Sequence, residues 1–368
     1  MGGRSCAMLM ALRPEASSRC GWGPQPQSPS PRLSARPPSL CTVHYFVTGA
    51  TGFLGGHVTA RLLDGGHQVT ALVRTGAEAR EIAAYGVRPH VGSVVDKETL
   101  RRGMRGVDGV FHVAGSRVGF PDRKTAEAVN VDGTRHVFEL VRELAIPKVV
   151  HTSTLSVLSD THGEVVDETY RFTGKHVTDY DRVRARAHYE VALPMMQHGV
   201  PGVVLLPGAM YGPHDASVMA GMLGKYLLGK VHVVSAGAAY CWAHVADVAQ
   251  AHVLAMEFGR PGEQYIVGGE PHTVRDVLSQ AGGLVGRNRP PIPVPPSLVR
   301  PAAAVVRAAA TIVPLWRLVA DRLRVAAGVT YLGTDAKARS ELGFDPRPLS
   351  EGMPDAIQWL LRDMFETV

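Results

Sequence analysis

Three evenly spaced glycines give this chain its clearest chemical signature. Gly49, Gly52 and Gly55 lie in the segment TGATGFLG, after a short apolar run and before residues with helical spacing. Glycine at these points would permit a tight turn, a close approach of the backbone to a pyrophosphate, and close packing of a helix on a strand. The free N–H groups at the helix N-terminus would bind the phosphates. A glycine-rich turn without function is the alternative, but the flanking pattern favours a dinucleotide site that also includes Phe53 and Leu54.

The end of the next apolar run bears on which dinucleotide binds. This run ends at Val73-Arg74, about twenty residues after the turn, and no Asp or Glu stands there to hold the adenosine ribose. An arginine at this position can accept the additional 2′-phosphate of NADP. We therefore predict NADP as the preferred cofactor and NAD as the alternative. A solvated arginine at a strand end is the competing explanation of Arg74.

Five further segments, together with the glycine turn, resemble the extended short-chain dehydrogenases/reductases, that is, the NAD(P)-dependent epimerase/dehydratase family. They are FHVAG (111–115), NVDGT (130–134), PGAMYGP (207–213), WAHVADVA (242–249) and ELGF (341–344). This family includes nucleotide-sugar epimerases and dehydratases, dihydroflavonol reductases and hydroxysteroid dehydrogenases. The resemblance implies bound NAD(H) or NADP(H), with Ala114 and Pro207 beside the cofactor. It is more specific for the fold than for the reaction.

The resemblance also implies a catalytic group of Ser/Thr, Tyr and Lys. By motif position, the first is Thr154, with Ser153 as the alternate, and the second is Tyr180. This chain departs from the family at the third position, where Arg184 replaces the lysine. Arginine keeps the positive charge and has donors for the nicotinamide ribose, but it is larger and does not enter a proton relay.

Tyr180 and Arg184 are one helical turn apart, so both would project from one face of a helix. A tyrosine can exchange a proton with a carbinol oxygen if its pKa, about 10 when free, is lowered, and a nearby cation lowers it by stabilising the phenolate. Thr154 would hold the substrate oxygen by a hydrogen bond. These assignments give Thr154, Tyr180 and Arg184 as catalytic residues, and the latter two also as cofactor contacts.

The arginine at position 184 allows three interpretations. Arg184 substitutes adequately for lysine, or the protein binds a dinucleotide without catalysis, or the substrate supplies the missing chemistry. The favoured function is an NAD(P)-dependent oxidoreductase acting on a carbonyl or secondary alcohol of a small organic or sugar-like substrate. The alternatives are a nucleotide-sugar epimerase or dehydratase that retains its cofactor, and a non-catalytic dinucleotide-binding protein. Four side chains could line the substrate pocket or equally belong to the core: Met210, Tyr211, His214 and Met219.

Alternating strands and helices must position these residues. The predicted strands are Val43–Thr48, Gln68–Arg74, Val87–Val91, Gly109–Val113, Lys148–Thr152 and Val203–Leu206. The predicted helices are 55–64, 77–85, Asp96–Met104, Thr125–Leu144 and a stretch around 180–198. This alternation predicts an α/β fold with a doubly wound parallel Rossmann sheet and right-handed crossovers.

The composition divides the chain into three parts. Residues 1–40 hold seven prolines and little apolar periodicity, which predicts a disordered extension outside the fold; a transit peptide is the alternative. Residues 41–206 form the predicted NAD(P)-binding Rossmann domain, with a later return near 241–256. Residues 207–368 form mainly a smaller α/β substrate-binding domain, because the alternation weakens after Pro207.

Charge and cysteine usage restrict the partners. The net charge is +6, but residues 1–40 carry five arginines and one acid, so the body is only about +2 and has no dense basic patch. We therefore predict no nucleic-acid partner. None of the four cysteines forms CxxC and none of the sixteen histidines lies in HExxH, so we predict no metal site, reduced cysteines and a cytoplasmic location.

No apolar run is long enough to predict a membrane span. The best candidate, Leu298–Ala320, is interrupted by arginines and reads as an amphipathic helix, at most an interfacial one. Most of the histidines are expected at the surface or in turns. A homodimer is a further implication of the resemblance, because family members often pair through two helices of the Rossmann domain.

Overall fold

The computed structural model describes residues 42–116, 123–309 and 328–366. The chain divides into two compact units, residues 1–37 and 38–368. The first unit, together with the predicted extension 1–40, lies outside the described residues, as does the second half of the run Leu298–Ala320.

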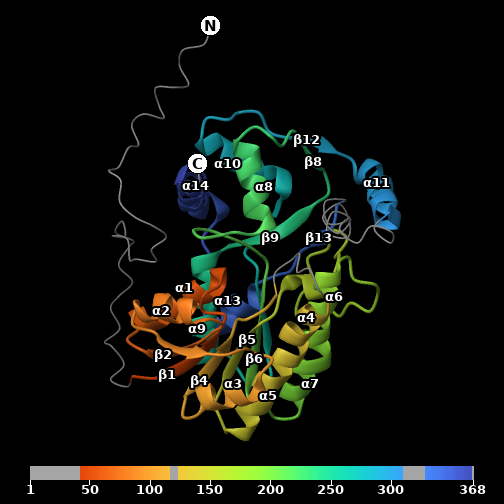
Figure 1. Ribbon diagram of the computed structural model, residues 1–368. Helices are drawn as coiled ribbons and strands as arrows, with labels where there is room; N and C mark the ends of the chain where they lie inside the picture. The colour runs from red at the N-terminus through yellow and green to blue at the C-terminus, as the bar shows by residue number, and fades with distance from the viewer. Residues whose placement is uncertain (1–41, 117–122, 310–327, 367–368) are drawn as a thin grey trace. The chain divides into compact units, whose positions relative to one another are not determined.

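A seven-stranded sheet, parallel throughout, forms the centre of this unit (Figure 1). Its strand order is β10-β6-β5-β4-β1-β2-β3. The strands are rich in Val, Leu, Ile and Phe because helices cover both faces of the sheet. Their bounds are β1 His44–Thr48, β2 Gln68–Val73, β3 Arg88–Val91, β4 Gly109–His112, β5 Val149–Thr152, β6 Gly202–Pro207 and β10 Gln264–Val267.

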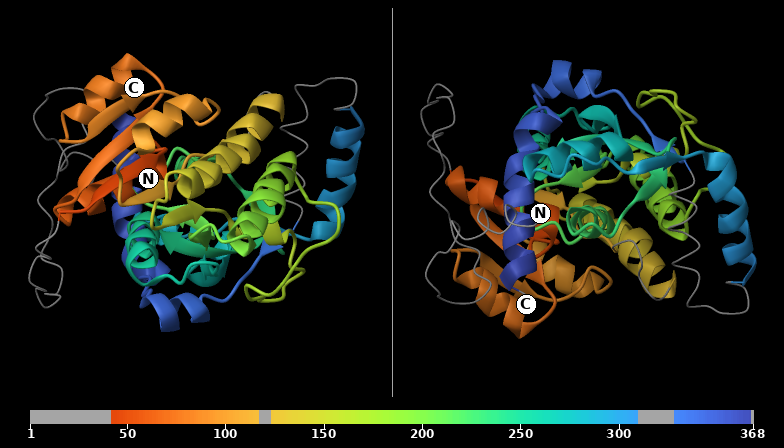
Figure 2. Two further views of the ribbon diagram at one scale, coloured as in Figure 1. Left: turned by 90° about the horizontal axis from the view of Figure 1, so that it is seen from below. Right: turned by 90° about the horizontal axis from the view of Figure 1, so that it is seen from above.

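Two layers of helices sandwich this sheet (Figure 2). One face packs on α1 Phe53–Asp64, α2 Gly76–Ala83, α9 Val245–Phe258 and α13 Ala336–Leu342. The other packs on α3 Lys97–Met104, on η1 Ala128–Asp132 with α5 Gly133–Glu143, and on α6 Asp179–Arg186 with η3 Ala187–Ala192 and α7 Leu193–Gln197. The short helix α4 Arg123–Glu127 precedes η1 and has no buried residue. The segments η1 and η3 are π-helical and interrupt the two long predicted helices.

A smaller assembly lies beyond the carboxyl ends of the strands. It holds a mixed sheet of β7 Ala209–Tyr211, β9 Ala239–His244, β11 Glu270–Thr273 and β13 Thr330–Tyr331, and a two-stranded ribbon of β8 Val233–Ser235 and β12 Ile292–Val294. Its helices are α8 Val218–Leu227, α10 Val274–Leu284, α11 Pro296–Ala309 and α14 Leu349–Glu366. Tyr226, Trp242 and Met353 belong to its own apolar core.

The fold class predicted from the sequence is confirmed, because the large sheet is parallel and doubly wound and a smaller sheet follows it. The strand order reverses between β1 and β4, and ligands of such sheets bind at that reversal. The large sheet also takes its outer strand, β10, from beyond Pro207, where we place the second domain. The domain boundaries themselves stay a prediction.

Within the described ranges, no helix is both long enough and apolar enough to span a bilayer. Over the same residues, no group of three or more His, Cys, Asp or Glu side chains is arranged to hold a metal ion. Five of the sixteen histidines are buried, which the sequence pattern did not indicate: His112, His151, His188, His244 and His252.

Candidate active site

The glycine turn joins the two strands on either side of the strand-order reversal. Gly49 has φ +79°, which glycine adopts without strain. A Cβ on Gly49 would lie 2.8 Å from the Ala114 nitrogen, at the end of β4. A Cβ on Gly55 would overlap the Gly49 carbonyl oxygen. The expected tight turn and close helix packing are therefore present, and Ala114 lies against them.

The start of α1 offers unpaired backbone donors. Gly52 is its N-cap, provides no side-chain cap, and has ordinary dihedral angles (φ −89°, ψ 171°). The first turn of α1 contains no acidic residue. Its N–H groups and the positive end of its dipole are thus available to an anion. A Cβ on any of the three glycines would lie within 3.1 Å of backbone atoms, so the compact turn favours glycine at all three positions. A compact turn before a free helix N-terminus fits a dinucleotide pyrophosphate.

Arg74, at the end of β2, is exposed and has an acidic neighbour. Its guanidinium donates to Glu78 at 2.9 Å, and its backbone N–H donates to the other Glu78 oxygen at 2.7 Å. Glu78 lies in the first turn of α2, one turn beyond the strand end. Hydrogen bonds and charge from Arg74 outweigh desolvation and lower the Glu78 pKa. We expected no acid here, so Glu78 is a group that sequence spacing missed.

The N-terminus of α6 places Tyr180. Thr178 and Asp181 form a reciprocal capping box, which fixes where this helix begins. Asp181 is 3% exposed and also accepts from the Tyr331 hydroxyl at 2.9 Å. Burial raises the Asp181 pKa. The first turn of α6 is therefore held by two sets of contacts. Tyr180 lies in this turn and is partly buried.

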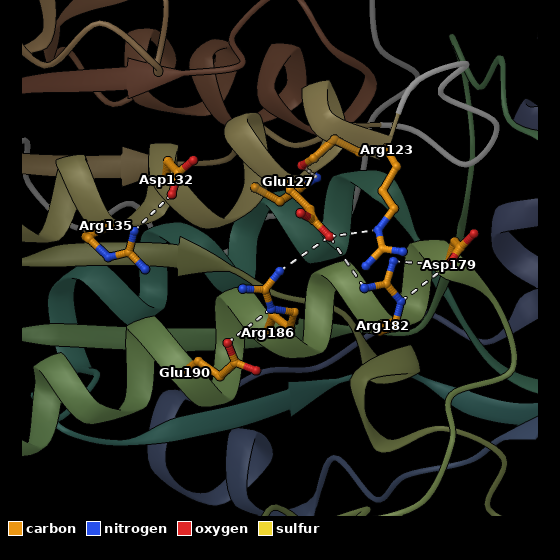
Figure 3. Close-up of polar contacts among 10 residues, drawn as sticks. Arg123, Glu127, Asp132, Arg135, Asp179, Arg182, Arg186 and Glu190 are labelled. Atoms are coloured by element: carbon orange, nitrogen blue, oxygen red, sulfur yellow. Dashed lines mark hydrogen bonds and ion pairs between the residues drawn. The ribbon is translucent and has the colours of Figure 1, made fainter.

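Ion pairs hold the outer face of α6 against α4 (Figure 3). Arg123, Arg182 and Arg186 all contact the Glu127 carboxylate, at 3.0, 3.4 and 3.3 Å. Hydrogen bonds and charge from these arginines lower the Glu127 pKa. The pairs lie at the surface and add little stability each, but they orient the helix. Its opposite face, which carries Arg184, is turned inward.

Arg184 is 6% exposed and binds neutral oxygen atoms. Its Nη2 donates to the Thr152 carbonyl at 2.6 Å, and its Nη1 donates to Asn130 Oδ1 at 3.1 Å. Its Nε is buried and has no hydrogen-bond partner among the residues that the structure describes. A buried polar nitrogen without a partner is costly, so this atom fits a role in ligand binding. Arg184 thus lies at the carboxyl end of β5.

The two candidate hydroxyls after β5 differ in their surroundings. Ser153 is 4% exposed, and its hydroxyl is bonded to His188 Nδ1 at 3.0 Å. Thr154 is partly buried and has only long contacts with Ser156, at 3.3 and 3.4 Å. The Thr154 hydroxyl is therefore the more available to a substrate oxygen, and we keep it as the predicted residue.

The acidity of Tyr180 differs from the expectation. Burial raises its pKa, Arg184 lowers it, and Asp181 raises it; the net direction is upward. The sequence argument included the cation but not the desolvation or the neighbouring carboxylate. The protein groups alone thus keep Tyr180 protonated at neutral pH, which suits a proton donor.

Buried neutral histidines lie near the arginine. Burial, then the charge of Arg184, lowers the pKa values of His112 and His188 to about 3. His112 and His151 stack with their ring centroids 5.0 Å apart. His112 bonds Thr48 and Thr134 at 2.8 and 3.2 Å. Through these contacts the two rings link β1, β4 and β5.

The four residues that we considered for a substrate pocket lie in different places in the structure. Tyr211 and Met219 line an apolar cavity of about 30 Å³ between α8, α10 and α14. Met210 instead packs on the core beside α9, and His214 is exposed. None of Thr154, Tyr180 and Arg184 lines this cavity, so it is distinct from the candidate catalytic group.

Comparison with known proteins identifies the family. The model of the NAD dependent epimerase/dehydratase family matches residues 45–268. Sterol demethylase protein B of Methylococcus capsulatus is 28% identical over 325 residues, which are 85% of this chain and 97% of that protein. A 4-hydroxy-2-methyl-3-oxo-4-farnesyl-3,4-dihydroquinoline-1-oxide ketoreductase of Stigmatella aurantiaca is 30% identical over 85% of this chain and 95% of its own. The crystal structure of gox2253 is similar with a TM-score of 0.77 and 30% identity, covering 88% and 99% of the two chains. This chain belongs to the NAD-dependent epimerase/dehydratase family, as its motifs indicated.

Proposed function

We propose that this protein is an NAD(P)-dependent oxidoreductase that interconverts a carbonyl group and a secondary alcohol on a lipophilic organic substrate. The observation that carries the proposal is the inward placement of Arg184 on α6, bonded to the end of β5 two residues before Thr154. The relatives' names support net redox chemistry on lipophilic compounds, since one is a ketoreductase of a farnesyl compound and another is a sterol demethylase protein.

Each residue of the group would have one task in the reducing direction. The Tyr180 hydroxyl would donate a proton to the carbonyl oxygen, which the Thr154 hydroxyl would hold in place. The Arg184 guanidinium would stabilise the phenolate that remains. The dinucleotide, when bound, supplies or accepts the hydride. Gly49, Gly52, Phe53, Leu54, Gly55, Ala114 and Pro207 are the residues that would hold it, with Arg74, Tyr180 and Arg184.

Replacing Tyr180 with phenylalanine tests this function. Because the proton donor is removed, we expect turnover of a lipophilic ketone to fall about 100-fold or more, with dinucleotide affinity within threefold of wild type. NADPH absorbance measures the first and a fluorescence titration the second. Tyr189→Phe is the matched control, since its hydroxyl has no hydrogen-bond partner and it lies in η3, next to α6. Equal turnover in wild type and Tyr180→Phe would rule out the assignment.

Cofactor preference depends on Arg74 and Glu78. We propose that NADP is preferred, with Glu78 limiting the preference because it already occupies the guanidinium. Arg74→Ala should weaken NADPH binding about tenfold and leave NADH binding nearly unchanged. Glu78→Gln should strengthen NADPH binding several-fold by removing the competing carboxylate. Titration of both cofactors measures these changes, and tighter binding of NADH than of NADPH by at least tenfold in the wild type would contradict the preference.

Assembly as a homodimer through the long helices α5 and η3–α7 stays a proposal that rests on the family resemblance. The groove between these helices is lined by Arg135, Glu139, Arg142, Glu190, Pro194 and His198, among others. Ion pairs and charged side chains are therefore prominent on this face, and a second copy would have to match them.

A further inference from the structure

The guanidinium of Arg184 is enclosed on the side of β4 by a residue that has no side chain. Gly115 follows β4, and a Cβ built on it would lie 2.7 Å from Arg184 Nη1 and 3.2 Å from Asn130 Oδ1. These two atoms are the donor and acceptor of one hydrogen bond. A methyl group at position 115 would therefore press on both ends of the bond that holds the guanidinium.

Space, and not backbone conformation, requires glycine at this position. Gly115 is described, and its φ does not lie in the left-handed region, so alanine is compatible with its backbone. The nearest obstacle, Nη1, is the far end of a long side chain that can move. An alanine at position 115 would thus leave the fold intact and displace the guanidinium instead.

We infer that Gly115 is a positioning residue for Arg184, and that glycine at 115 and arginine at 184 form a size-matched pair in which the missing side chain makes room for the larger cation. The inference rests on the proposed function, because it gives Arg184 a role at the cofactor. Asn130 is the third member of the arrangement: its Oδ1 accepts from Arg184, and its Nδ2 donates to the Ala126 carbonyl at 2.8 Å.

The pair explains how an arginine fits where the family resemblance leads us to expect lysine. A lysine ends in one small ammonium group and has no planar fork to accommodate. With lysine at 184, the space at Gly115 is no longer required by Nη1. Alanine at 115 should therefore be harmful beside arginine and tolerated beside lysine.

A double-mutant cycle tests this coupling with wild type, Gly115→Ala, Arg184→Lys and the double variant. Dinucleotide affinity, turnover and the midpoint of thermal unfolding without cofactor are measured for each. We expect Gly115→Ala to weaken dinucleotide binding and reduce kcat/KM at least tenfold, with an unfolding midpoint near that of wild type. The double variant should return to within threefold of Arg184→Lys alone. Gly283→Ala is the control, because a Cβ there has no atom within 4 Å.

Two results would overturn the inference. Gly115→Ala could bind and turn over like wild type, or its loss could be equally large beside arginine and beside lysine. Failure of the proposed function is distinguishable, because the binding and unfolding measurements complete the cycle without any turnover. If Tyr180→Phe proved fully active while the binding cycle still showed rescue by lysine, the pair would stand and the catalytic assignment would not.

Discussion

Lowering the pH from 7 to 5 should destabilise the folded protein by several kcal/mol. Burial is the main cause that lowers the pKa values of His112 and His188 to about 3 and that of His252 to about 4. It also holds the pKa of His151 well below its usual range. In the unfolded chain the same rings titrate near 6.5. The unfolded state therefore binds more protons below pH 6.5, and stability falls as the pH falls.

The size of this effect follows from linkage. Each histidine contributes fully above pH 6.5 and loses about 1.4 kcal/mol per pH unit below it until its folded pKa is reached. At pH 5 the loss is about 2 kcal/mol for each ring, so His112, His188 and His252 together approach about 6 kcal/mol as an upper limit, which is comparable to the whole stability of many domains. Paired carboxylates such as Glu127, whose pKa is lowered, titrate below this window.

Urea unfolding at pH 7.5, 6 and 5 measures the loss. His188→Gln should reduce the pH dependence by about one proton, because one depressed ring is removed. His232→Gln is the matched control, because this histidine is exposed. A free energy of unfolding that is constant between pH 7 and 5 would show that the buried rings do not stay neutral.

Replacing Gly55 with alanine should destabilise the fold and abolish dinucleotide binding. The new methyl would overlap the Gly49 carbonyl oxygen, which belongs to the backbone and cannot move without opening the turn. Overpacking of this kind costs about 3 kcal/mol or more. Gly76→Ala in the neighbouring helix α2 is the control, because its Cβ would meet nothing nearer than 3.8 Å, and it should be neutral or stabilising by about 0.5–1 kcal/mol.

Gly52→Ala keeps this test informative if Gly55→Ala fails to fold. Its Cβ would lie 3.1 Å from the Gly49 carbonyl oxygen, and its dihedral angles suit alanine. Folding should persist, whereas NADPH affinity should fall at least tenfold because the methyl stands where the pyrophosphate approaches. Titration and urea unfolding report the two quantities separately, and unimpaired binding would show that the cofactor does not approach this turn.

Local patterns in the sequence were sufficient for most of the large sheet. Short apolar runs predicted most of the first six strands nearly to the residue, because strands covered on both faces carry no polar alternation. Strand β3, with the sequence RPHV, is mostly exposed and is the exception. The two long helices were predicted as uninterrupted, whereas each contains a π-helical turn, η1 or η3. Hydrophobic periodicity over a whole helix does not reveal one added residue in a single turn.

The site was predictable where motifs define it and not where packing does. Gly49 and Gly55 form the tight turn and close packing that their spacing predicted, because the spacing fixes a strand, turn and helix. The contact of Gly49 with Ala114 was not predicted. Glu78 escaped notice because its reach back to Arg74 depends on where α2 begins. Asn130 and Gly115 were part of quoted motifs, but their contact with Arg184 joins elements 54 positions or more apart, which no local pattern encodes.

The position of β10 has a consequence for how the protein emerges from the ribosome. Strand β6 pairs on one side with β5 and on the other with Gln264–Val267 of β10, which is made some sixty residues later. Until then the edge of β6 offers unpaired backbone N–H and C=O groups to any other extended chain. A nascent chain that has not yet released Gln264–Val267 from the ribosome therefore carries an open sheet edge, and pairing of β10 with β6 removes this edge as a site of aggregation.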